Sequence, residues 1–321
     1  MNYKPIIVTA GDPESIFYEI FFKSLKKKIF LSPIILISSK DVLLRNMESF
    51  KFYKKIRYIN VINIRKLTLN NNTINLIDVK LKTSKQIFKN KRYINDYINN
   101  CYELAFNLIK KKFTNKIITG PINKKKFLNK KFLGITEFIS KKFNNKNTGM
   151  LIYNKQISVC PLTTHLPIKL VSKNITKSMI KNKINLINSF YKNVLNFKPK
   201  IAVVGLNPHC ESILKINEDE KIIKPIINNL KKKNINVNGP FSADTIFLKQ
   251  NRKKFNVIVG MYHDQVLAPM KTLFEYDAIN ITMGLPFLRV SPDHGPNVEM
   301  INKNISNPIS LIRALEFLDK I

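Results

Sequence analysis

Short runs of apolar residues recur along the chain, and polar residues follow each of them. Five runs end in glycine, in the segments IIVTAG, IITG, IAVVG, VIVG and INITMG, at Gly11, Gly120, Gly205, Gly260 and Gly284. Short apolar runs bounded by turn residues are typical of buried strands. Glycine tolerates a positive φ and the close approach of other atoms. The pattern therefore predicts a parallel sheet with its functional site at the carboxyl ends of the strands.

Two long stretches between these runs have apolar residues at helical spacing. Residues 84–112 and 175–197 repeat apolar side chains every three to four positions, which predicts amphipathic helices. Strands that alternate with helices indicate an α/β protein. No internal repeat and no low-complexity linker divides the chain. A two-domain chain of this kind would pass between its domains more than once.

The densest group of chemically useful side chains follows the apolar run that ends in Gly260. These side chains are His263, Asp264, Lys271, Asn280 and Arg289. Histidine beside aspartate suits a metal or a proton transfer, whereas lysine, asparagine and arginine suit an anionic substrate. We expect a buried strand that opens into a polar loop with an active site. A strand, a turn and a solvated helix are the plainer alternative.

Histidine is rare in this chain, and three of its four histidines follow apolar runs. His165, His209 and His263 occur in the contexts TTHLP, NPHC and YHDQ. Three neutral imidazoles at strand ends, with one coordination position left open, are typical of a catalytic divalent metal. Asp244 and Asp264 are further candidates for ligands, for residues that orient the ligands, or for proton acceptors. The sequence contains no GxGxxG, Walker A or GxSxG motif.

Composition narrows the class of protein. The formal net charge is +34, but the basic residues are mostly lysine and are spread over the whole chain, as an A/T-rich genome would encode. We therefore expect a solvated basic surface, no specific nucleic-acid site, and at most weak non-specific binding at low salt. No apolar run is long enough for a membrane span, and no signal peptide is expected. The three cysteines form no CxxC pair, which favours a reducing cytoplasm without disulfides.

Eight motifs, in this order, resemble the 4-hydroxythreonine-4-phosphate dehydrogenase family of vitamin B6 biosynthesis. They are AGDP, TGPINK, THLP, GLNPH, GPFSADT, YHDQVLAPMK, INITMGLPFLR and DHG, and the resemblance extends from about residue 7 to residue 300. It implies an α/β fold of the isocitrate/isopropylmalate dehydrogenase-like class, with two α/β/α domains and a cleft between them. We expect the first domain at residues 1–125 with 280–321. The second, at 126–279, would carry the metal ligands and dimer contacts.

The resemblance also implies a reaction. A cytoplasmic homodimer with shared active sites would oxidise a small phosphorylated amino acid, 4-phosphooxy-L-threonine, with NAD or NADP. The product, 2-amino-3-oxo-4-phosphooxybutanoate, would then lose CO2 as part of pyridoxal 5'-phosphate synthesis. One divalent metal per site, Zn, Co or Mg, would lower the pKa of the substrate hydroxyl and stabilise the enolate that decarboxylation leaves.

The resemblance also implies roles for individual residues. The metal ligands implied are His165, His209 and His263, drawn from both subunits, and the substrate contacts are Thr136, Lys271, Asn280 and Arg289. Our candidate catalytic proton carriers are Asp244 and Asp264. The segment Asp293, His294 and Gly295 resembles the loop that binds the adenosine side of the cofactor.

The chain also departs from the family pattern. Ile135 replaces a histidine that touches the substrate phosphate, since GITE stands where the family has GHTE. Loss of such a donor costs about 1.5–3 kcal/mol if nothing replaces it. The loops after AGDP and NPH also lack glycines that the family has. We expect weakened activity, and two alternatives remain: a same-fold dehydrogenase of another phosphorylated hydroxy acid, such as a threonate phosphate, or a decayed enzyme retained as a basic binding protein.

Overall fold

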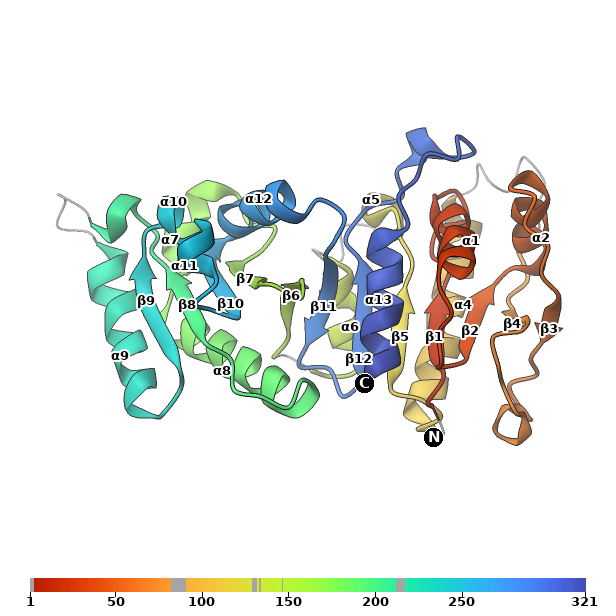
Figure 1. Ribbon diagram of the computed structural model, residues 1–321, viewed down its shortest axis with the longest axis horizontal. Helices are drawn as coiled ribbons and strands as arrows, with labels where there is room; N and C mark the ends of the chain where they lie inside the picture. Colours follow the sequence, from red (N-terminus) through yellow and green to blue (C-terminus); the bar gives the residue numbers. More distant parts are fainter. Residues whose placement is uncertain (1–2, 82–90, 129–131, 133, 146, 212–216) are drawn as a thin grey trace. The chain divides into compact units, whose positions relative to one another are not determined.

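The computed structural model describes residues 3–81, 91–128, 132, 134–145, 147–211 and 217–321. The chain folds into two compact units (Figure 1). The first unit comprises Met1–Ile135 with Pro286–Ile321, and the second comprises Thr136–Leu285. The chain therefore leaves the first unit and returns to it. Of the helix predicted at 84–112, residues 84–90 lie outside the described residues, and the remainder forms α4 (Lys91–Lys110).

The first unit is built on a parallel sheet. Its strands in spatial order are β3 (Ile56–Tyr58), β4 (Ile74–Asp78), β2 (Ile34–Ser38), β1 (Ile6–Thr9), β5 (Lys116–Thr119) and β12 (Leu288–Pro292). Each neighbouring pair is parallel, and Val8 lies opposite both Leu36 and Ile118. The carboxyl ends of these strands therefore lie along one edge, as the apolar runs predict.

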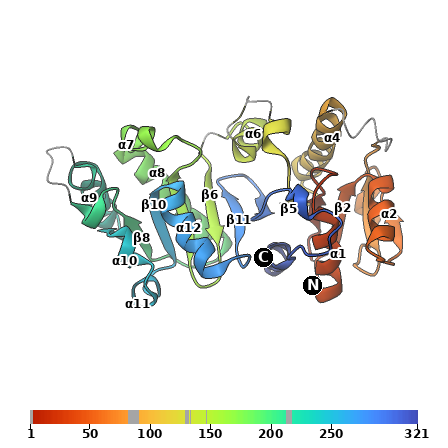
Figure 2. The ribbon, with the colours of Figure 1, turned by 90° about the horizontal axis from the view of Figure 1, so that it is seen from above.

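Helices cover both faces of this sheet. The remaining helical elements of the unit are α1 (Phe17–Lys27), α2 (Lys40–Ser49), α5 (Lys124–Phe127), α13 (Ile309–Lys320) and the short turns η1 (Ile64–Lys66) and η5 (Val298–Met300). Helices α1 and α13 lie on one face and α4 lies on the other (Figure 2). Helix α1 buries an aromatic stripe in which the Phe17 and Phe21 rings stack at 5.5 Å.

The second unit contains a mixed sheet. Its strands in spatial order are β11 (Ile279–Met283), β6 (Gly149–Tyr153), β7 (Ser158–Thr163), β10 (Val257–Tyr262), β8 (Ile201–Val204) and β9 (Val237–Phe241). Strand β6 is antiparallel to both neighbours, whereas β7, β10, β8 and β9 are parallel. The expectation of a wholly parallel sheet is therefore wrong at β6. A tight turn at Asn154–Gln156, where Asn154 Oδ1 accepts from Gln156 N at 2.8 Å, joins β6 to β7, and such turns connect only antiparallel strands.

Helices also cover both faces of this second sheet. The helical elements of the unit are α6 (Ile135–Lys142), α7 (Val171–Asn174), α8 (Lys177–Val194), α9 (Lys224–Lys232), α10 (Ala243–Ile246), α11 (Lys249–Arg252) and α12 (His263–Phe274), with turns η2 (Ile168–Leu170), η3 (Pro208–Cys210) and η4 (Asp219–Ile223). Helix α8 lies on one face and α12 on the other (Figure 2). The Thr176 hydroxyl caps α8 by accepting from Met179 N at 3.2 Å. Its buried residues Ile180, Ile184 and Ile187 recur at the helical spacing that the sequence predicts.

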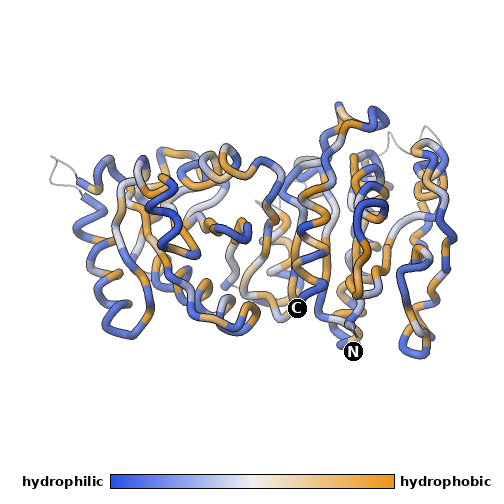
Figure 3. Tube along the Cα trace, in the orientation of Figure 1, coloured by the Kyte–Doolittle hydropathy of each residue, from blue (hydrophilic) through white to orange (hydrophobic). Residues whose placement is uncertain are grey.

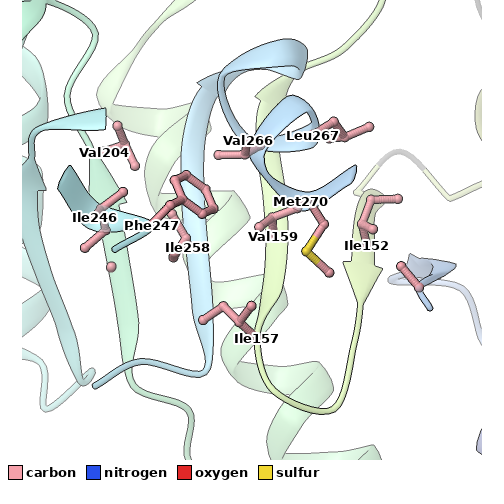
Figure 4. Packing of buried hydrophobic residues seen from close by; sticks show 12 residues of the cluster. Ile152, Ile157, Val159, Val204, Ile246, Phe247, Ile258, Val266, Leu267 and Met270 are labelled. Atoms are coloured by element: carbon pink, nitrogen blue, oxygen red, sulfur yellow. The ribbon is translucent and has the colours of Figure 1, made fainter. Parts of the chain in front are cut away.

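A compact apolar core joins α12 to the strands of the second unit. Val266, Leu267 and Met270 of α12 pack on Val159, Ile258 and their neighbours (Figure 4). Hydrophobic positions follow the strands, and hydrophilic positions predominate on the outer turns of helices such as α9 (Figure 3). In the part of the chain that the structure describes, no helix is both long enough and apolar enough to span a membrane.

Candidate active site

Three neighbouring parallel strands bring the three strand-end histidines to one edge of the second unit. Strand β10 lies between β7 and β8, with Tyr262 opposite Thr163 in the shared register. The histidines that follow β7, β10 and β8 are His165, His263 and His209. The segments that continue from these strands, including α7 and α12, lie along the same edge in Figure 1. The sheet thus gathers residues that the sequence separates widely.

Two of these histidines have an unusual backbone conformation. The φ angle is 53° at His165 and 56° at His209, and Cys210 follows at 61°. A left-handed backbone is unfavourable for residues other than glycine, and such conformations cluster at functional sites. The position of the two histidines within short, sharply turning connections points to a role beyond packing.

His263 occupies a different setting from the one expected. Strand β10 continues through Gly260 to Tyr262, and α12 begins directly at His263. The prediction of a polar loop is therefore wrong here. Gly260 permits the junction, because a Cβ at this position would lie 2.4 Å from Val266 Cγ1 in the first turn of α12. The helix can fold back against the strand that precedes it only where this side chain is absent.

The imidazoles of His165 and His263 lie close together. Their ring centroids are 6.2 Å apart, with 34° between the ring planes. His263 Nδ1 lies 2.6 Å from Asp264 Oδ1 in a hydrogen bond of the kind that orients metal-binding histidines. Among the described residues, no three His, Cys, Asp or Glu side chains are grouped closely enough to bind a metal within this single chain. The structure thus brings the imidazoles of His165 and His263 together. His209 follows a strand that ends at the same edge of the sheet.

The residue that follows His209 is Cys210, whose thiol is partly buried. Burial raises the pKa of the Cys210 thiol above its ordinary value, and the negative charges of Asp219 and Asp244 act in the same direction. Hydrogen bonds from Gly205 and Ser242 oppose this rise. Asp244, in the first turn of α10, is exposed, and the Asp264 side chain is 83% exposed. Both candidate proton carriers therefore reach solvent.

Asp219 and Gln265 are polar residues at this edge that sequence analysis did not select. Asp219 is completely buried, although it lies in a segment that looks like the start of a charged, solvated helix. Gln265 is half-buried in the first turn of α12. The hydropathy pattern does not single out either residue. The signal in the sequence is the pair of glycines packed against them, Gly205 and Gly260.

The candidate substrate residues are divided between the units. In the first unit, Arg289 is 2% exposed, and its guanidinium donates to Thr119 Oγ1. Burial raises the pKa of Tyr102 to about 12, and the positive charge of Arg289 partly offsets that rise. In the second unit, Lys271 is half-buried on α12, and Asn280 Oδ1 is buried without a hydrogen-bond partner. A buried guanidinium and an unsatisfied buried amide oxygen are both suited to polar ligand groups.

Thr136 and Ile135 lie at the start of α6. Ile135 is only 8% exposed, and Thr136 is half-buried with its carbonyl accepting from Ser140 Oγ at 2.7 Å. Thr136 lies in the first turn of α6, next to the position where the family has a histidine.

The candidate cofactor segment belongs to the first unit. Asp293 N donates to Ser310 Oγ at 2.8 Å, His294 Nδ1 lies 3.0 Å from the Gly295 carbonyl, and Ile16 N donates to the Pro296 carbonyl. These contacts fix the segment between α1 and α13. A pocket of about 450 Å³ lies beside it. The lining residues are Pro13, Glu14, Val42, Arg45, Asn46, Ser49, Val298, Ile301 and Asn302.

Comparisons with known proteins give a consistent result. A family model described as "Pyridoxal phosphate biosynthetic protein PdxA" matches residues 30–318. A 4-hydroxythreonine-4-phosphate dehydrogenase from Sulfurihydrogenibium sp. is 35% identical over 97% of this chain and 96% of its own length. A D-threonate 4-phosphate dehydrogenase from Salmonella typhimurium is 29% identical over 92% of each chain.

The fold is also shared with solved structures. The crystal structure of 4-hydroxythreonine-4-phosphate dehydrogenase from Klebsiella pneumoniae superimposes with a TM-score of 0.82, at 27% identity and 98% coverage of both chains. The predicted α/β fold class is therefore confirmed.

Proposed function

Because the chain belongs to the family of the pyridoxal phosphate biosynthetic protein PdxA, we propose that it oxidises 4-phosphooxy-L-threonine with NAD or NADP. The product is 2-amino-3-oxo-4-phosphooxybutanoate, which then loses CO2. The family predicted from the eight motifs is confirmed by the family match. The observation that carries the proposal is the placement of His165, His209 and His263 at the ends of three adjacent parallel strands.

The donor set at this edge fits a divalent metal. Zinc binds imidazole nitrogen at about 2.0–2.1 Å, so two ligands to one ion have ring centroids roughly 5–6 Å apart. The 6.2 Å between the rings of His165 and His263 is close to that spacing. With Nδ1 held by Asp264, His263 would bind the metal through Nε2. A homodimer in which ligands come from both subunits would complete the site. When bound, a Zn, Co or Mg ion supplies a Lewis acid for the substrate oxygens.

The chemistry of the polar residues that match the family suits the substrate. Arg289 and Lys271 would bind its phosphate and carboxylate by charge-assisted hydrogen bonds, and Asn280 and Thr136 would bind its neutral polar groups. Asp264 or Asp244 would accept the proton of the substrate hydroxyl, since both carboxylates reach solvent and can pass the proton on. Ile135 offers no hydrogen bond, so phosphate binding depends on the remaining donors.

The cofactor would bind at the first unit through Asp293, His294 and Gly295. The adjoining pocket of about 450 Å³ lies in the range of small-molecule sites. It is lined by Val298 and Ile301 from the continuation of the same segment, which are suited to an adenine ring, and by Arg45 from α2. When bound, the nicotinamide accepts the hydride.

A substrate panel tests the proposal. Purified protein is assayed with 4-phosphooxy-L-threonine and with D-threonate 4-phosphate, following the near-ultraviolet absorbance of the reduced cofactor with NAD and with NADP. Chelation followed by restoration of Zn, Co or Mg tests the metal requirement. We expect turnover of 4-phosphooxy-L-threonine that chelation abolishes and metal restores.

D-threonate 4-phosphate is the second candidate substrate. The similarity to D-threonate 4-phosphate dehydrogenases and the change at Ile135 both favour it as the alternative. Preferential turnover of D-threonate 4-phosphate would replace the first substrate and keep the reaction class. No turnover of either compound together with no metal binding would overturn the proposal and favour a decayed enzyme retained as a basic binding protein.

A further inference from the structure

Two polar side chains at the carboxyl edge of the second unit contact the backbone of the histidine-bearing segments. These are Gln265 and Asp219, and neither takes part in the chemistry described above. Glycines make room for both. A Cβ at Gly205 would lie 2.6 Å from Asp219 Oδ1, and a Cβ at Gly260 would lie 3.1 Å from Gln265 Oε1. The sequence thus preserves space for these two side chains.

Gln265 connects β10 to the end of β8. The backbone pairing of the two strands ends at Val259 and Val203. Further along, Gln265 Oε1 accepts from Met261 N at 2.7 Å, and Gln265 Nε2 donates to the Gly205 carbonyl at 2.8 Å. A backbone N–H only donates and a carbonyl only accepts, so these partners fix the orientation of the amide. The side-chain amide of Gln265 thus makes the hydrogen bonds that a backbone peptide group makes between paired strands.

The same strand is fixed on its other side. Thr163 Oγ1 donates to the Met261 carbonyl at 2.8 Å, so both backbone polar groups of Met261 are bound by side chains. One chain of hydrogen bonds therefore spans the ends of β7, β10 and β8. His165, His263 and His209 follow these three ends within a few residues.

Asp219 fixes the segment that leads to His209. Its carboxylate accepts from Leu206 N at 2.8 Å, from Asn207 N at 3.0 Å and from Asn207 Nδ2 at 2.8 Å. Because a left-handed backbone is unfavourable at a histidine, the residues before it must hold it in place. The three bonds to Asp219 supply that constraint, and the complete burial of the carboxylate shields them from water.

We propose that Gln265 and Asp219 are positioning residues of the metal site. Gln265 sets the separation between the strand ends that carry His263 and His209, and Asp219 holds the backbone of His209 in its ligating conformation. This inference rests on the metal-dependent function proposed above. Groups that orient metal ligands typically change metal affinity by about 10–100-fold when removed.

Cobalt binding by the full-length chain tests the inference. Co²⁺ is titrated into metal-free wild type, Gln265→Glu and Asp219→Asn, recording the affinity and the visible absorption spectrum of the bound ion. Gln265→Glu keeps the size of the side chain and an acceptor for Met261 N, but it loses the donor to the Gly205 carbonyl. We expect Co²⁺ to bind about 10–100-fold more weakly to each variant, with an altered spectrum. Gln265→Met, which keeps the volume without a charge, replaces Gln265→Glu if that protein does not fold.

Asn75→Asp is the matched control, since it makes the same chemical change in a buried amide of the first unit. Asn75 Nδ2 donates to the Ile34 carbonyl at 3.0 Å and to the Asn70 carbonyl at 2.8 Å. The control should lower the unfolding midpoint and leave Co²⁺ affinity unchanged. Wild-type affinity in all Gln265 and Asp219 variants, or an equal loss in the control, would overturn the positioning role while the proposed function stands. If wild type binds no divalent ion, the metal-dependent function and this inference are both wrong.

Discussion

The hydroxyl oxygen of Thr119 accepts two hydrogen bonds from the guanidinium of Arg289, from Nε at 3.1 Å and from Nη2 at 2.7 Å. Both residues are buried, so the hydroxyl fixes the plane of a guanidinium that we propose binds the substrate. Thr119→Val keeps the shape of the side chain and removes the acceptor. We expect KM for the phosphorylated substrate to rise about tenfold, equivalent to roughly 1.4 kcal/mol, with a smaller change in kcat.

Thr119→Ser is the control for this change, because it retains the hydroxyl. Steady-state kinetics of both variants at saturating cofactor would measure the effect. A KM of Thr119→Ser as high as that of Thr119→Val would contradict the role of the hydrogen bonds and indicate loss of packing.

Because His209 has a left-handed backbone, replacing it should change metal affinity and stability separately. His209→Gly and His209→Ala both remove the imidazole, so both should lose metal affinity. Glycine adopts a positive φ freely, whereas alanine retains the steric cost of about 1–2 kcal/mol. We expect the metal-free glycine variant to be about 1 kcal/mol more stable than the alanine variant in urea unfolding. Equal stabilities would mean that the segment relaxes to another conformation.

Ile135 offers a direct test of the departure from the family pattern. Ile135→His places an imidazole where the family has one, and we expect KM for 4-phosphooxy-L-threonine to fall by about tenfold. The native side chain is only 8% exposed, so the same change should lower the free energy of unfolding by about 1–3 kcal/mol. Kinetics and denaturant unfolding of the same preparation measure both effects. An unchanged KM would show that other donors already satisfy the phosphate.

Glu218 predicts a pH-dependent contribution to stability. The Ser172 hydroxyl donates to its carboxylate, and this hydrogen bond, helped by Asn207 and opposed by burial, holds the pKa of Glu218 below the ordinary value of 4.5. A lowered pKa in the folded state stabilises the protein above the unfolded-state pKa. That contribution is lost as pH falls through the folded-state pKa.

Ser172→Ala should therefore destabilise the protein by about 1 kcal/mol at neutral pH, because one hydrogen bond is lost. The difference from wild type should shrink as the pH falls below the ordinary carboxyl pKa. Denaturant unfolding across the acidic range measures it. A difference that stays constant with pH would assign the effect of Ser172 to α7 itself.

Much of this fold could be predicted from the pattern of apolar runs. The run IAVVG contains β8, and the helix predicted at 175–197 contains α8. The expectation failed at β6 because pairing direction depends on the length of the connection, which hydropathy does not encode. It failed again at His263 because the strand continues through Gly260 and leaves no loop.

The candidate site was only partly accessible from the sequence. Histidines after apolar runs stand out because they are rare, and strand adjacency brings His165 and His263 together. Asp219 and Gln265 do not stand out, because their importance arises from hydrogen bonds to backbone atoms far along the chain. A carboxylate in a lysine-rich segment looks solvated until the fold shows that it is buried.

The bond between Gln265 and Gly205 has an evolutionary consequence. Backbone ladders resist change, since every residue other than proline supplies the same N–H and carbonyl groups. Where a side chain makes the connection, one amino-acid replacement can alter how far apart two strand ends lie. Adaptation to a different metal or a longer substrate could therefore begin at Gln265, outside the ligand set, while the rest of the sheet keeps its register.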